Sequence, residues 1–189
     1  MIRVPGPRCQ TPIHEGETAT LPARVGMGED RHRLTPGGPL RLGGIEIPHD
    51  QRLSGHSDAD ALLHAVTDAL LGAAALGDIG ELFPDTDAAN RDRDSAEMLR
   101  VCRQRVVEGG FRIVNLDCTV LAERPRLSPY KEPMRQRIAE ILAVAPSRVG
   151  LKAKTGEGTG CVGREEVIEA RCVVLLARVG SGAGEPAGG

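Results

Sequence analysis

Residues 55–87 read GHSDADALLHAVTDALLGAAALGDIGELFPDTD, and this stretch predicts the helix around which the fold is organised. Its apolar side chains recur at helical spacing with alanines between them, so one wide face of the helix should be buried. These side chains are Leu62, Leu63, Val66, Leu70 and Leu71. The pair of Ser57 and Asp60 resembles a capping box and predicts a helix that starts just after His56. Gly77 predicts its left-handed C-terminal cap.

The start of this helix carries polar side chains that favour two kinds of ligand. Asp60 and His64 are four residues apart, so both lie on one helical face, where the carboxylate can orient the imidazole or both can approach a cation. His56 stands just outside the expected helix start, where free backbone amides and the helix dipole favour an anion such as phosphate. The helix therefore predicts both a metal ligand and an anion site.

The composition predicts one globular domain without a nucleic-acid or membrane partner. The chain has 189 residues, of which 40% are hydrophobic, and this is enough for a single buried core. Its net charge of −2 gives no strong field to attract nucleic acid or an anionic membrane. Only Phe83, Phe111 and Tyr130 are aromatic, so stacking platforms for single strands are lacking.

Cysteine usage and hydropathy favour a cytoplasmic protein. The five cysteines are far apart and form no C-x-x-C pair, which is typical of reduced thiols. The first sixteen residues, MIRVPGPRCQTPIHEG, contain no apolar run that would serve as a signal peptide. No segment of the sequence approaches membrane-spanning length.

The rest of the chain alternates between expected strands and helices. We expect a flexible extension over 1–22, a single domain over 23–179 and a flexible tail over 180–189. Strands are predicted over 23–32, 40–48, 112–123, 149–154 and 166–179, the second of them a strand or hairpin arm broken at paired glycines. Further helices are predicted over 95–108, capped by Asp94, and over about 130–144. This order predicts an α/β fold, an α+β sandwich in which helices cover one side of one mixed sheet.

Three side chains form the strongest candidate metal site. Asp30 and His32 are two residues apart on an expected strand, so both point to the same face. His64 would join them from the buried helix. Two imidazoles, one carboxylate and an open fourth position are the ligand set of a catalytic zinc. The alternative is that the three residues only form hydrogen bonds with neighbouring loops.

A glycine-rich stretch, KAKTGEGTG at 152–160, is a candidate phosphate site. Backbone amides freed by the glycines can surround phosphate oxygens, Thr155 can donate its hydroxyl, and Glu157 can hold Mg²⁺. Arg164 could add a forked contact to phosphate. The alternative is an ordinary flexible hairpin, because glycine-rich turns are common.

A third candidate lies where the organising helix ends, in the sequences DIG at 78–80 and FPDTD at 83–87. A carboxylate on a tight turn can accept hydrogen bonds from vicinal sugar hydroxyls. It can equally be a solvated helix exit. The arginines of 122–127 are solvated by default.

The motifs together resemble a known family. They are D-x-H at 30–32, H-S-D-x-D-x-x-x-H-A at 56–65, TDALLGAAALGDIG at 67–80 and FPDTD, and they occur in the family's order. The chain resembles the 2-C-methyl-D-erythritol 2,4-cyclodiphosphate synthases from about Arg24 to Arg178. The resemblance implies a catalytic domain over 23–179 and a homotrimer with each active site between neighbouring subunits.

The resemblance also implies metal ligands and catalytic residues. Asp30, His32 and His64 match the ligands of one Zn²⁺ per subunit, whose fourth ligand is a substrate phosphate oxygen. Glu157 matches the ligand of a second ion, Mg²⁺ or Mn²⁺, that bridges the diphosphate. His56 and Thr155 match residues that stabilise the transition state, and Ser57 a residue that contacts phosphate.

The implied substrate pocket has three parts. Asp78 and Gly80 match residues that hold ribose and erythritol hydroxyls, 83–87 match the pocket lining, and 122–128 match the backbone segment that receives cytosine. The full implied substrate-binding set is Asp30, Arg31, His32, His56, Ser57, Asp78, Ile79, Gly80, Phe83, Pro84, Asp85, Thr86, Asp87, Ala122, Glu123, Arg124, Pro125, Arg126, Leu127, Ser128, Lys154, Thr155, Gly156, Glu157, Cys161 and Arg164.

The implied reaction belongs to non-mevalonate isoprenoid biosynthesis and is that of a phosphorus-oxygen lyase. The 2-phosphate of 4-diphosphocytidyl-2-C-methyl-D-erythritol 2-phosphate attacks the β-phosphorus, and CMP leaves as the cyclic diphosphate forms. Such a transfer needs alignment and charge neutralisation more than a strong base. Two alternatives stay open: a zinc-dependent nucleotide-diphosphate hydrolase, which would release a linear product, and a non-catalytic trimeric zinc protein.

Some residues depart from the family pattern. Glu29 stands where an aromatic residue is usual, and Lys154 and Gly156 stand where threonines are usual. Arg126 replaces a common lysine, and Cys161 replaces a phenylalanine near the pocket. These departures bear on substrate affinity more than on the type of reaction.

Overall fold

The structure, a computed structural model, describes residues 23–179. The extension predicted over 1–22 and the tail predicted over 180–189 lie outside the described residues. The described residues share one continuous hydrophobic core between a sheet and its covering helices.

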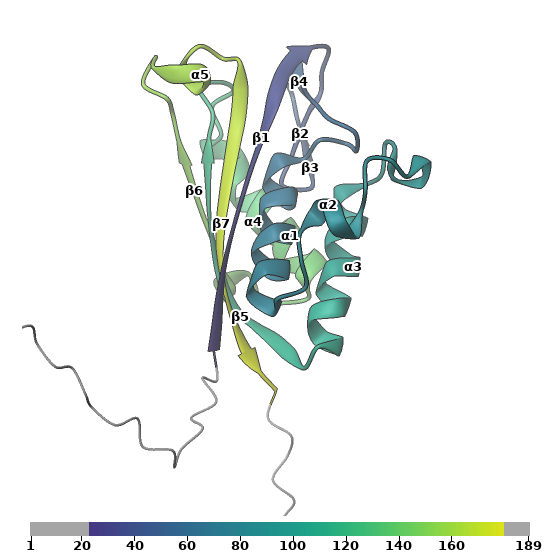
Figure 1. The fold of residues 1–189 in the computed structure, drawn as a ribbon. Helices are drawn as coiled ribbons and strands as arrows, with labels where there is room; N and C mark the ends of the chain where they lie inside the picture. The colour runs from purple at the N-terminus through teal and green to yellow at the C-terminus, as the bar shows by residue number, and fades with distance from the viewer. Residues whose placement is uncertain (1–22, 180–189) are drawn as a thin grey trace, which may run out of the picture.

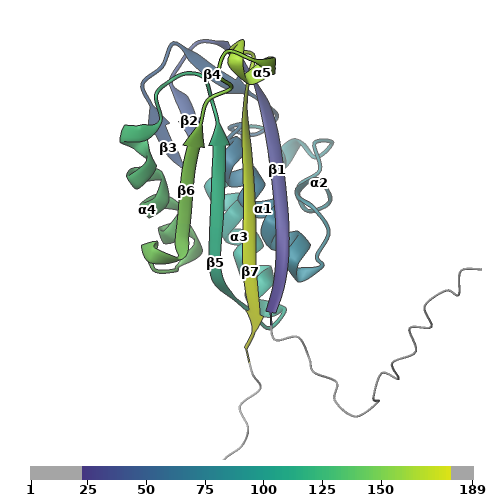
Figure 2. The ribbon, with the colours of Figure 1, turned by 90° about the vertical axis from the view of Figure 1, so that its left-hand side faces the viewer.

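A five-stranded mixed sheet forms one layer of the fold. Its strands lie in the order β4 (Gln51–Ser54), β1 (Ala23–Pro36), β7 (Val167–Arg178), β5 (Phe111–Leu121) and β6 (Val149–Lys154). Three of the four pairings are antiparallel, and the pairing of β5 with β6 is parallel. Figure 2 shows the sheet from its uncovered side, with the long strands β1, β7 and β5 at its centre.

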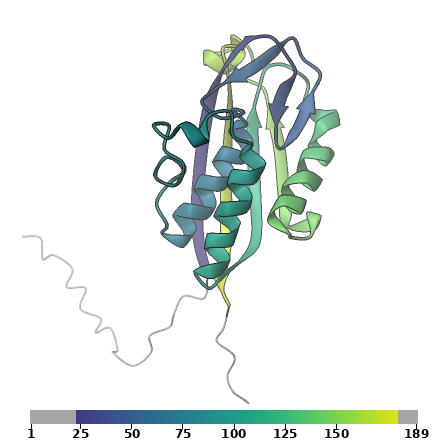
Figure 3. The ribbon, with the colours of Figure 1, turned by 90° about the vertical axis from the view of Figure 1, so that its right-hand side faces the viewer.

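Helices form the second layer and cover one face of the sheet, as predicted. The long helices are α1 (Ala61–Ala74), α3 (Ser95–Glu108) and α4 (Lys131–Leu142), and Figure 3 shows all three in front of the strands. The short helices α2 (Ile79–Leu82) and α5 (Gly160–Gly163) follow loops, and single 3-10 turns occupy Ala88–Asn90, Ser128–Tyr130 and Pro146–Arg148. A small hairpin of β2 (Leu40–Leu42) and β3 (Ile45–Ile47) confirms the interruption predicted at the paired glycines.

Two glycines let α1 pack unusually close to β1. A Cβ atom added to Gly26 would lie 2.0 Å from the carbonyl oxygen of Ala69, and one added to Gly28 would lie 2.2 Å from that of Ala65. Side chains alternate along a strand, so these glycines lie on the same face as Asp30. The missing side chains therefore bring the helix against the strand just before the strand's polar residues begin.

The predicted ends of α1 are wrong. The helix begins at Ala61 with Asp60 as its N-cap, four residues later than expected after His56. Residues 56–58 are instead held outside the helix by backbone hydrogen bonds, from Asp92 N–H to the carbonyl of His56 (2.9 Å) and from Asp58 N–H to the carbonyl of Arg93 (3.2 Å). The left-handed cap is Ala75, not Gly77. Tertiary pairing thus overrides the local capping signal.

Other predicted elements are confirmed with shifted ends. The strand expected over 23–32 continues to Pro36, because its last residues pair with β4, a strand that local pattern did not reveal. The helix expected from about 130 begins at Lys131 after a 3-10 turn. The α3 prediction is confirmed, with Asp94 accepting a hydrogen bond from Ala96 N–H (2.9 Å) as N-cap.

Candidate metal centre

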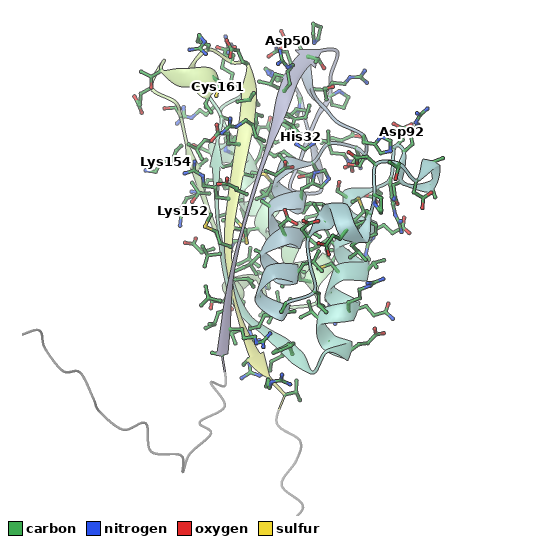
Figure 4. All side chains as sticks on the ribbon, viewed as in Figure 1. His32, Asp50, Asp92, Lys152, Lys154 and Cys161 are labelled. Carbon is green, nitrogen blue, oxygen red and sulfur yellow. The ribbon has the colours of Figure 1, made fainter. Side chains whose placement is uncertain are left out.

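The structure brings Asp30, His32 and His64 together where β1 meets the first turn of α1. Oδ2 of Asp30 lies 2.9 Å from Nδ1 of His64 and 2.9 Å from Nδ1 of His32. One donor atom from each of the three residues lies within 4.8 Å of the other two. Figure 4 labels His32, whose side chain points from β1 toward the helical layer. The predicted convergence of these three side chains is therefore confirmed.

The register of β1 explains why both strand residues reach the helix. Asp30 and His32 pair with Ala170 and Ile168 of β7, two residues that are fully buried on the helical side of the sheet. Arg31, between them, points to the opposite face and pairs with Glu169 there (3.0 Å). Only the backbone N–H of Arg31 contacts the cluster, at 2.7 Å from Oδ1 of Asp30.

Electrostatics favour a charged carboxylate in this cluster. Burial would raise the pKa of Asp30, but its contacts with His32 and His64 outweigh burial and hold that pKa well below its usual value. Burial would lower the pKa of His64, and the close contact and negative charge of the Asp30 carboxylate outweigh this and raise it. An ionised carboxylate between two imidazoles is an arrangement that attracts a cation.

The donor set fits a divalent metal. Nδ1 of His32 is buried and lacks a hydrogen-bond partner of acceptable geometry, although Asp30 is near. A buried ring nitrogen without a partner costs free energy unless a ligand such as a metal ion satisfies it. Two imidazole nitrogens and one carboxylate oxygen are a ligand set that zinc uses in catalytic sites.

Asp60 does not take part in this cluster, contrary to the prediction. Its carboxylate is fully buried and accepts hydrogen bonds from the backbone N–H groups of Gly43 (2.8 Å), Gly44 (2.6 Å) and Leu63 (3.0 Å). Burial raises its pKa, and these three amides act in the opposite direction. Asp60 therefore ties the β2–β3 hairpin to α1, while Asp30 orients His64.

A cavity of about 340 Å³ opens beside the cluster. Most of the predicted residues on this side of the molecule line it: Asp30, His32, His56, Ser57, His64, Ile79, Gly80, Phe83 and Asp85. The lining also includes Gly55, Asp68, Asn90 and Met98, which were not predicted as site residues. Asp68 follows His64 by one helical turn, so its spacing was a usable signal. No local pattern pointed to Asn90 or Met98.

The residues after α1 shape this cavity by local capping. Asp78 accepts a hydrogen bond from Glu81 N–H (2.8 Å) as N-cap of α2, and Oδ1 of Asp68 accepts one from Ile79 N–H (2.8 Å). Asp87 caps the following turn through Ala89 N–H (3.0 Å). Pro84, Thr86, Asp78 and Asp87 are exposed and do not line the cavity.

His56, like His32, presents a buried ring nitrogen without a hydrogen-bond partner within residues 23–179 at the cavity wall. Its Nε2 is buried and has no hydrogen-bond partner among the described residues. Ser57, the next residue, places its hydroxyl 3.1 Å from Nε2 of His64. Both side chains are therefore available to polar groups of a ligand in the cavity.

The predicted residues of 122–128 and 154–164 lie in a second, separate region (Figure 4). A cavity of about 320 Å³ is lined by Ala122, Glu123, Pro125, Arg126, Leu127, Ser128, Ala153, Lys154 and Thr155, and it shares no residue with the first cavity. Figure 4 shows Lys154 and Cys161 beside β6 and α5, across β7 and β1 from His32. One chain therefore does not bring the two groups together.

Hydrogen bonds within the second group arrange its glycine-rich loop. The hydroxyl of Thr155 donates to Oε1 of Glu157 (2.9 Å), and Gly156 N–H donates to Oε2 of Glu123 (3.0 Å). Glu157 has a positive φ of 51°, an uncommon conformation for a residue with a side chain. Arg164, predicted as a phosphate fork, pairs with Glu166 at 2.8 Å.

The fold and the site define a class of protein: an α/β domain with a sheet covered on one side and an Asp-His-His cluster beside a polar cavity. The profile of the YgbB family matches residues 23–177, and the chain belongs to this family. The chain is 51% identical over 162 residues to the 2-C-methyl-D-erythritol 2,4-cyclodiphosphate synthase of Gemmatimonas aurantiaca, with 86% of this chain and 98% of that protein covered.

Solved structures agree with this assignment. The chain is similar to a 2C-methyl-D-erythritol-2,4-cyclodiphosphate synthase in a CDP-bound form, with a TM-score of 0.75, 40% identity and coverage of 81% of this chain and 99% of that one. It is also similar to the bifunctional IspDF from Campylobacter jejuni, with a TM-score of 0.80, 40% identity and coverage of 83% of this chain. The match spans 42% of that bifunctional protein.

Within residues 23–179, the helices are too short or too polar to cross a membrane.

Proposed function

We propose that this chain converts 4-diphosphocytidyl-2-C-methyl-D-erythritol 2-phosphate into 2-C-methyl-D-erythritol 2,4-cyclodiphosphate and CMP. The observation that carries the proposal is the cluster of Asp30, His32 and His64 beside a polar cavity. It occurs in a chain about half identical to synthases of this name along nearly their whole length. The product is a precursor of isoprenoids in the non-mevalonate pathway.

Asp30, His32 and His64 would hold one Zn²⁺, and Glu157 would hold a second ion, Mg²⁺ or Mn²⁺. Bound there, the ions would polarise phosphate oxygens and neutralise charge that develops during transfer. The chain's own residues do the positioning. Asp30 stays ionised between the two imidazoles, 2.9 Å from each ring, and the buried first turn of α1 holds His64 in place.

His56 and Ser57 bind the phosphates in this proposal. Nε2 of His56 is a buried ring nitrogen without a partner, so a phosphate oxygen in the cavity would satisfy it. The Ser57 hydroxyl lies on the same loop and faces the same cavity. Gly55 lets this loop pass close to the cluster, since a Cβ atom there would lie 2.7 Å from Nε2 of His32.

The segment after α1 binds the sugar in this proposal. Ile79 and Gly80 line the cavity at the start of α2, where backbone groups can bond to vicinal hydroxyls, while the Asp78 carboxylate caps this helix and fixes their position. Phe83 is buried under the guanidinium of Arg93, which lies 4.9 Å from the ring centre, so its ring makes a fixed wall.

We infer that the second group of residues completes the cavity of a neighbouring subunit in a homotrimer. The loop residues 122–128 and 154–157 would bring the cytosine site, Thr155 and Glu157 to the cluster of another chain. The uncovered face of the sheet supports association, because it exposes Val25 (69%), Met27 (63%) and Val173 (46%). Exposed apolar side chains gathered on one face are typical of an interface.

Product analysis tests the proposed reaction. Phosphorus NMR should show a cyclic diphosphate, and CMP should appear at the same rate. A zinc-dependent hydrolase would give a linear product, and a non-catalytic zinc protein would bind metal without releasing CMP. Metal analysis of the same purified sample identifies the bound ions. A linear product would overturn the proposal. A cytoplasmic location stays a prediction from the sequence.

A further inference from the structure

The second ring nitrogen of His64 faces away from the cluster and into a buried hydrogen-bond chain. Nε2 of His64 lies 2.8 Å from the hydroxyl of Ser95 and 3.1 Å from that of Ser57. Ser95 is the first residue of α3 and is fully buried. Its hydroxyl donates to Oδ1 of Asp58, and its backbone N–H donates to Oδ2 of the same carboxylate (3.2 Å).

The protonation state of Asp58 sets the donor-to-acceptor direction of these hydrogen bonds. An aspartate carboxylate only accepts hydrogen bonds, so the single proton of the Ser95 hydroxyl is committed to Asp58. Ser95 must then accept from His64, and Nε2 of that ring must carry a proton. The tautomer that has its proton on Nε2 keeps a lone pair on Nδ1, the nitrogen that faces Asp30 and the cluster.

We propose that Ser95 and Asp58 are positioning residues that select the metal-binding tautomer of His64 and hold its ring toward Asp30 and His32. A metal-ligating histidine usually donates its other ring N–H to a carboxylate or carbonyl. Here a serine hydroxyl relays that bond to the carboxylate. The proposal rests on the proposed metal site and adds two residues to it that do not touch the metal.

The surroundings hold the relay in one geometry. Asp58 is only 11% exposed at its side chain, and the guanidinium Nε of Arg41 lies 3.6 Å from its Oδ2. Two backbone hydrogen bonds join residues 56–58 to the segment just before α3. Hydrogen bonds therefore tie the start of α3 both to the loop that carries His56 and Ser57 and to His64.

The relay also leaves the hydroxyl proton of Ser57 available to a ligand in the cavity. Ser57 accepts a hydrogen bond from Ala59 N–H (3.3 Å), and the His64 proton is directed to the nearer hydroxyl of Ser95. The hydroxyl proton of Ser57 then has no committed acceptor in the relay. It can be donated to a ligand oxygen in the cavity, which Ser57 lines.

Nitrogen NMR of the wild-type protein loaded with Zn²⁺ tests the tautomer directly. With ¹⁵N-labelled histidine, His64 should show a protonated Nε2 and a metal-bound, unprotonated Nδ1, and the H64A variant assigns the signals. A proton on Nδ1, or metal bound through Nε2, would overturn the inference without any variant of the relay.

Metal affinity of variants tests the roles of the two residues. S95A removes the relay, and we expect its Zn²⁺ affinity to fall roughly 10–100-fold in a chelator competition titration. S95T keeps a hydroxyl and should recover most of that affinity. D58A should lower the Zn²⁺ affinity by a similar factor to S95A. In the Co²⁺-loaded proteins, the visible absorption bands should shift in S95A and D58A and stay unchanged in S95T.

The matched control is D94A, which removes the N-cap of the same helix but leaves the relay intact. D94A should lose stability and keep its Zn²⁺ affinity. Equal loss of Zn²⁺ affinity in D94A and S95A would show that affinity depends on the stability of the start of α3 and not on the Ser95 hydroxyl. That result would overturn the inference. Wild-type protein that binds no divalent metal would contradict the proposed function itself. Wild-type affinity in S95A would contradict only the relay.

Discussion

The two halves of the proposed site are held in different ways. The cluster at the β1–α1 contact is mostly buried, and each imidazole lies against Asp30. The loop with Thr155 and Glu157 is exposed, and its side chains bond mainly to one another. A buried cluster is set by its own chain, whereas an exposed loop at the edge of a sheet leaves its groups free for a neighbouring molecule. On the proposed function, the buried half is preassembled within one chain, and the exposed half acts at the cluster of a second subunit.

Removal of a proposed metal ligand should have the largest effect on activity. H64A should lower CMP release roughly 10³-fold or more, because the several kcal/mol of charge stabilisation assigned to the metal would be lost. A coupled CMP assay measures the rate, and circular dichroism checks the fold. Near-normal release from folded H64A protein would show that the cluster is not part of the reaction.

Mixing two inactive variants tests whether the halves come from different subunits. H64A damages the cluster and E157A damages the loop, so co-expressed variants should form mixed trimers that contain some sites with neither change. CMP release should then rise above that of either variant alone. Sedimentation measures the trimer. If activity does not recover although mixed trimers form, both halves belong to one chain's site.

A side chain at the close contact between β1 and α1 should damage the preassembled half. G28A would place its Cβ atom 2.2 Å from the Ala65 carbonyl oxygen, so we expect a loss of about 1–3 kcal/mol in unfolding free energy and weaker Zn²⁺ binding. Urea unfolding and a metal titration measure the two effects.

The control for G28A is G72A, on α1, the helix that Gly28 contacts. A Cβ atom at Gly72 meets no other atom within 4 Å, so this change should stabilise the protein by about 0.5–1 kcal/mol, as alanine does in helices. If G28A were as stable as wild type, the close approach of β1 and α1 would not require a glycine at position 28.

The Asp60 cap should affect stability more than metal binding. In D60N, the amide group can no longer accept all three backbone hydrogen bonds, so we expect a loss of about 1–3 kcal/mol in unfolding free energy. Zn²⁺ affinity should stay close to wild type, because the Asp60 carboxylate bonds to backbone amides and not to the His64 ring. A large loss of affinity in folded D60N would restore Asp60 to the metal site.

The smallest effect concerns thiol reactivity in the two regions. Burial raises the pKa of the Cys102 thiol to about 12, so almost no thiolate exists at pH 8 and an alkylating reagent should not modify it in the native protein. Cys161, which is half-buried near the loop, should react first among the cysteines of residues 23–179. Mass spectrometry of peptides after brief alkylation measures both. Fast labelling of Cys102 would show that α3 opens readily.

Several elements were predictable because their signals are local. The apolar spacing of residues 62–71 predicted α1, and the alternation of Asp30 and His32 predicted that both face one side. The Asp94 cap is a contact within one turn, and it too was predicted. The resemblance to the synthases supplied the roles, which composition and spacing alone left open between metal binding and simple hydrogen bonding.

Signals that depend on distant partners were missed. Asp60 was expected to orient His64, but the amides of the β2–β3 hairpin take its carboxylate. Ser95 lies 31 residues from His64, and no local pattern connects them. The strand β4 is short and forms because β1 offers it an edge.

The sequence by itself determined the order of the long helices and strands and the identity of the three clustered side chains, because periodicity and ligand chemistry are properties of neighbouring residues. Tertiary structure decided that Gly26 and Gly28 bring α1 onto β1, that Asp30 rather than Asp60 orients His64, and that the two halves of the site lie apart in one chain. Those outcomes depend on close packing and on the hydrogen-bond partners of buried polar groups. Both are decided only when segments that are distant in the sequence pack together.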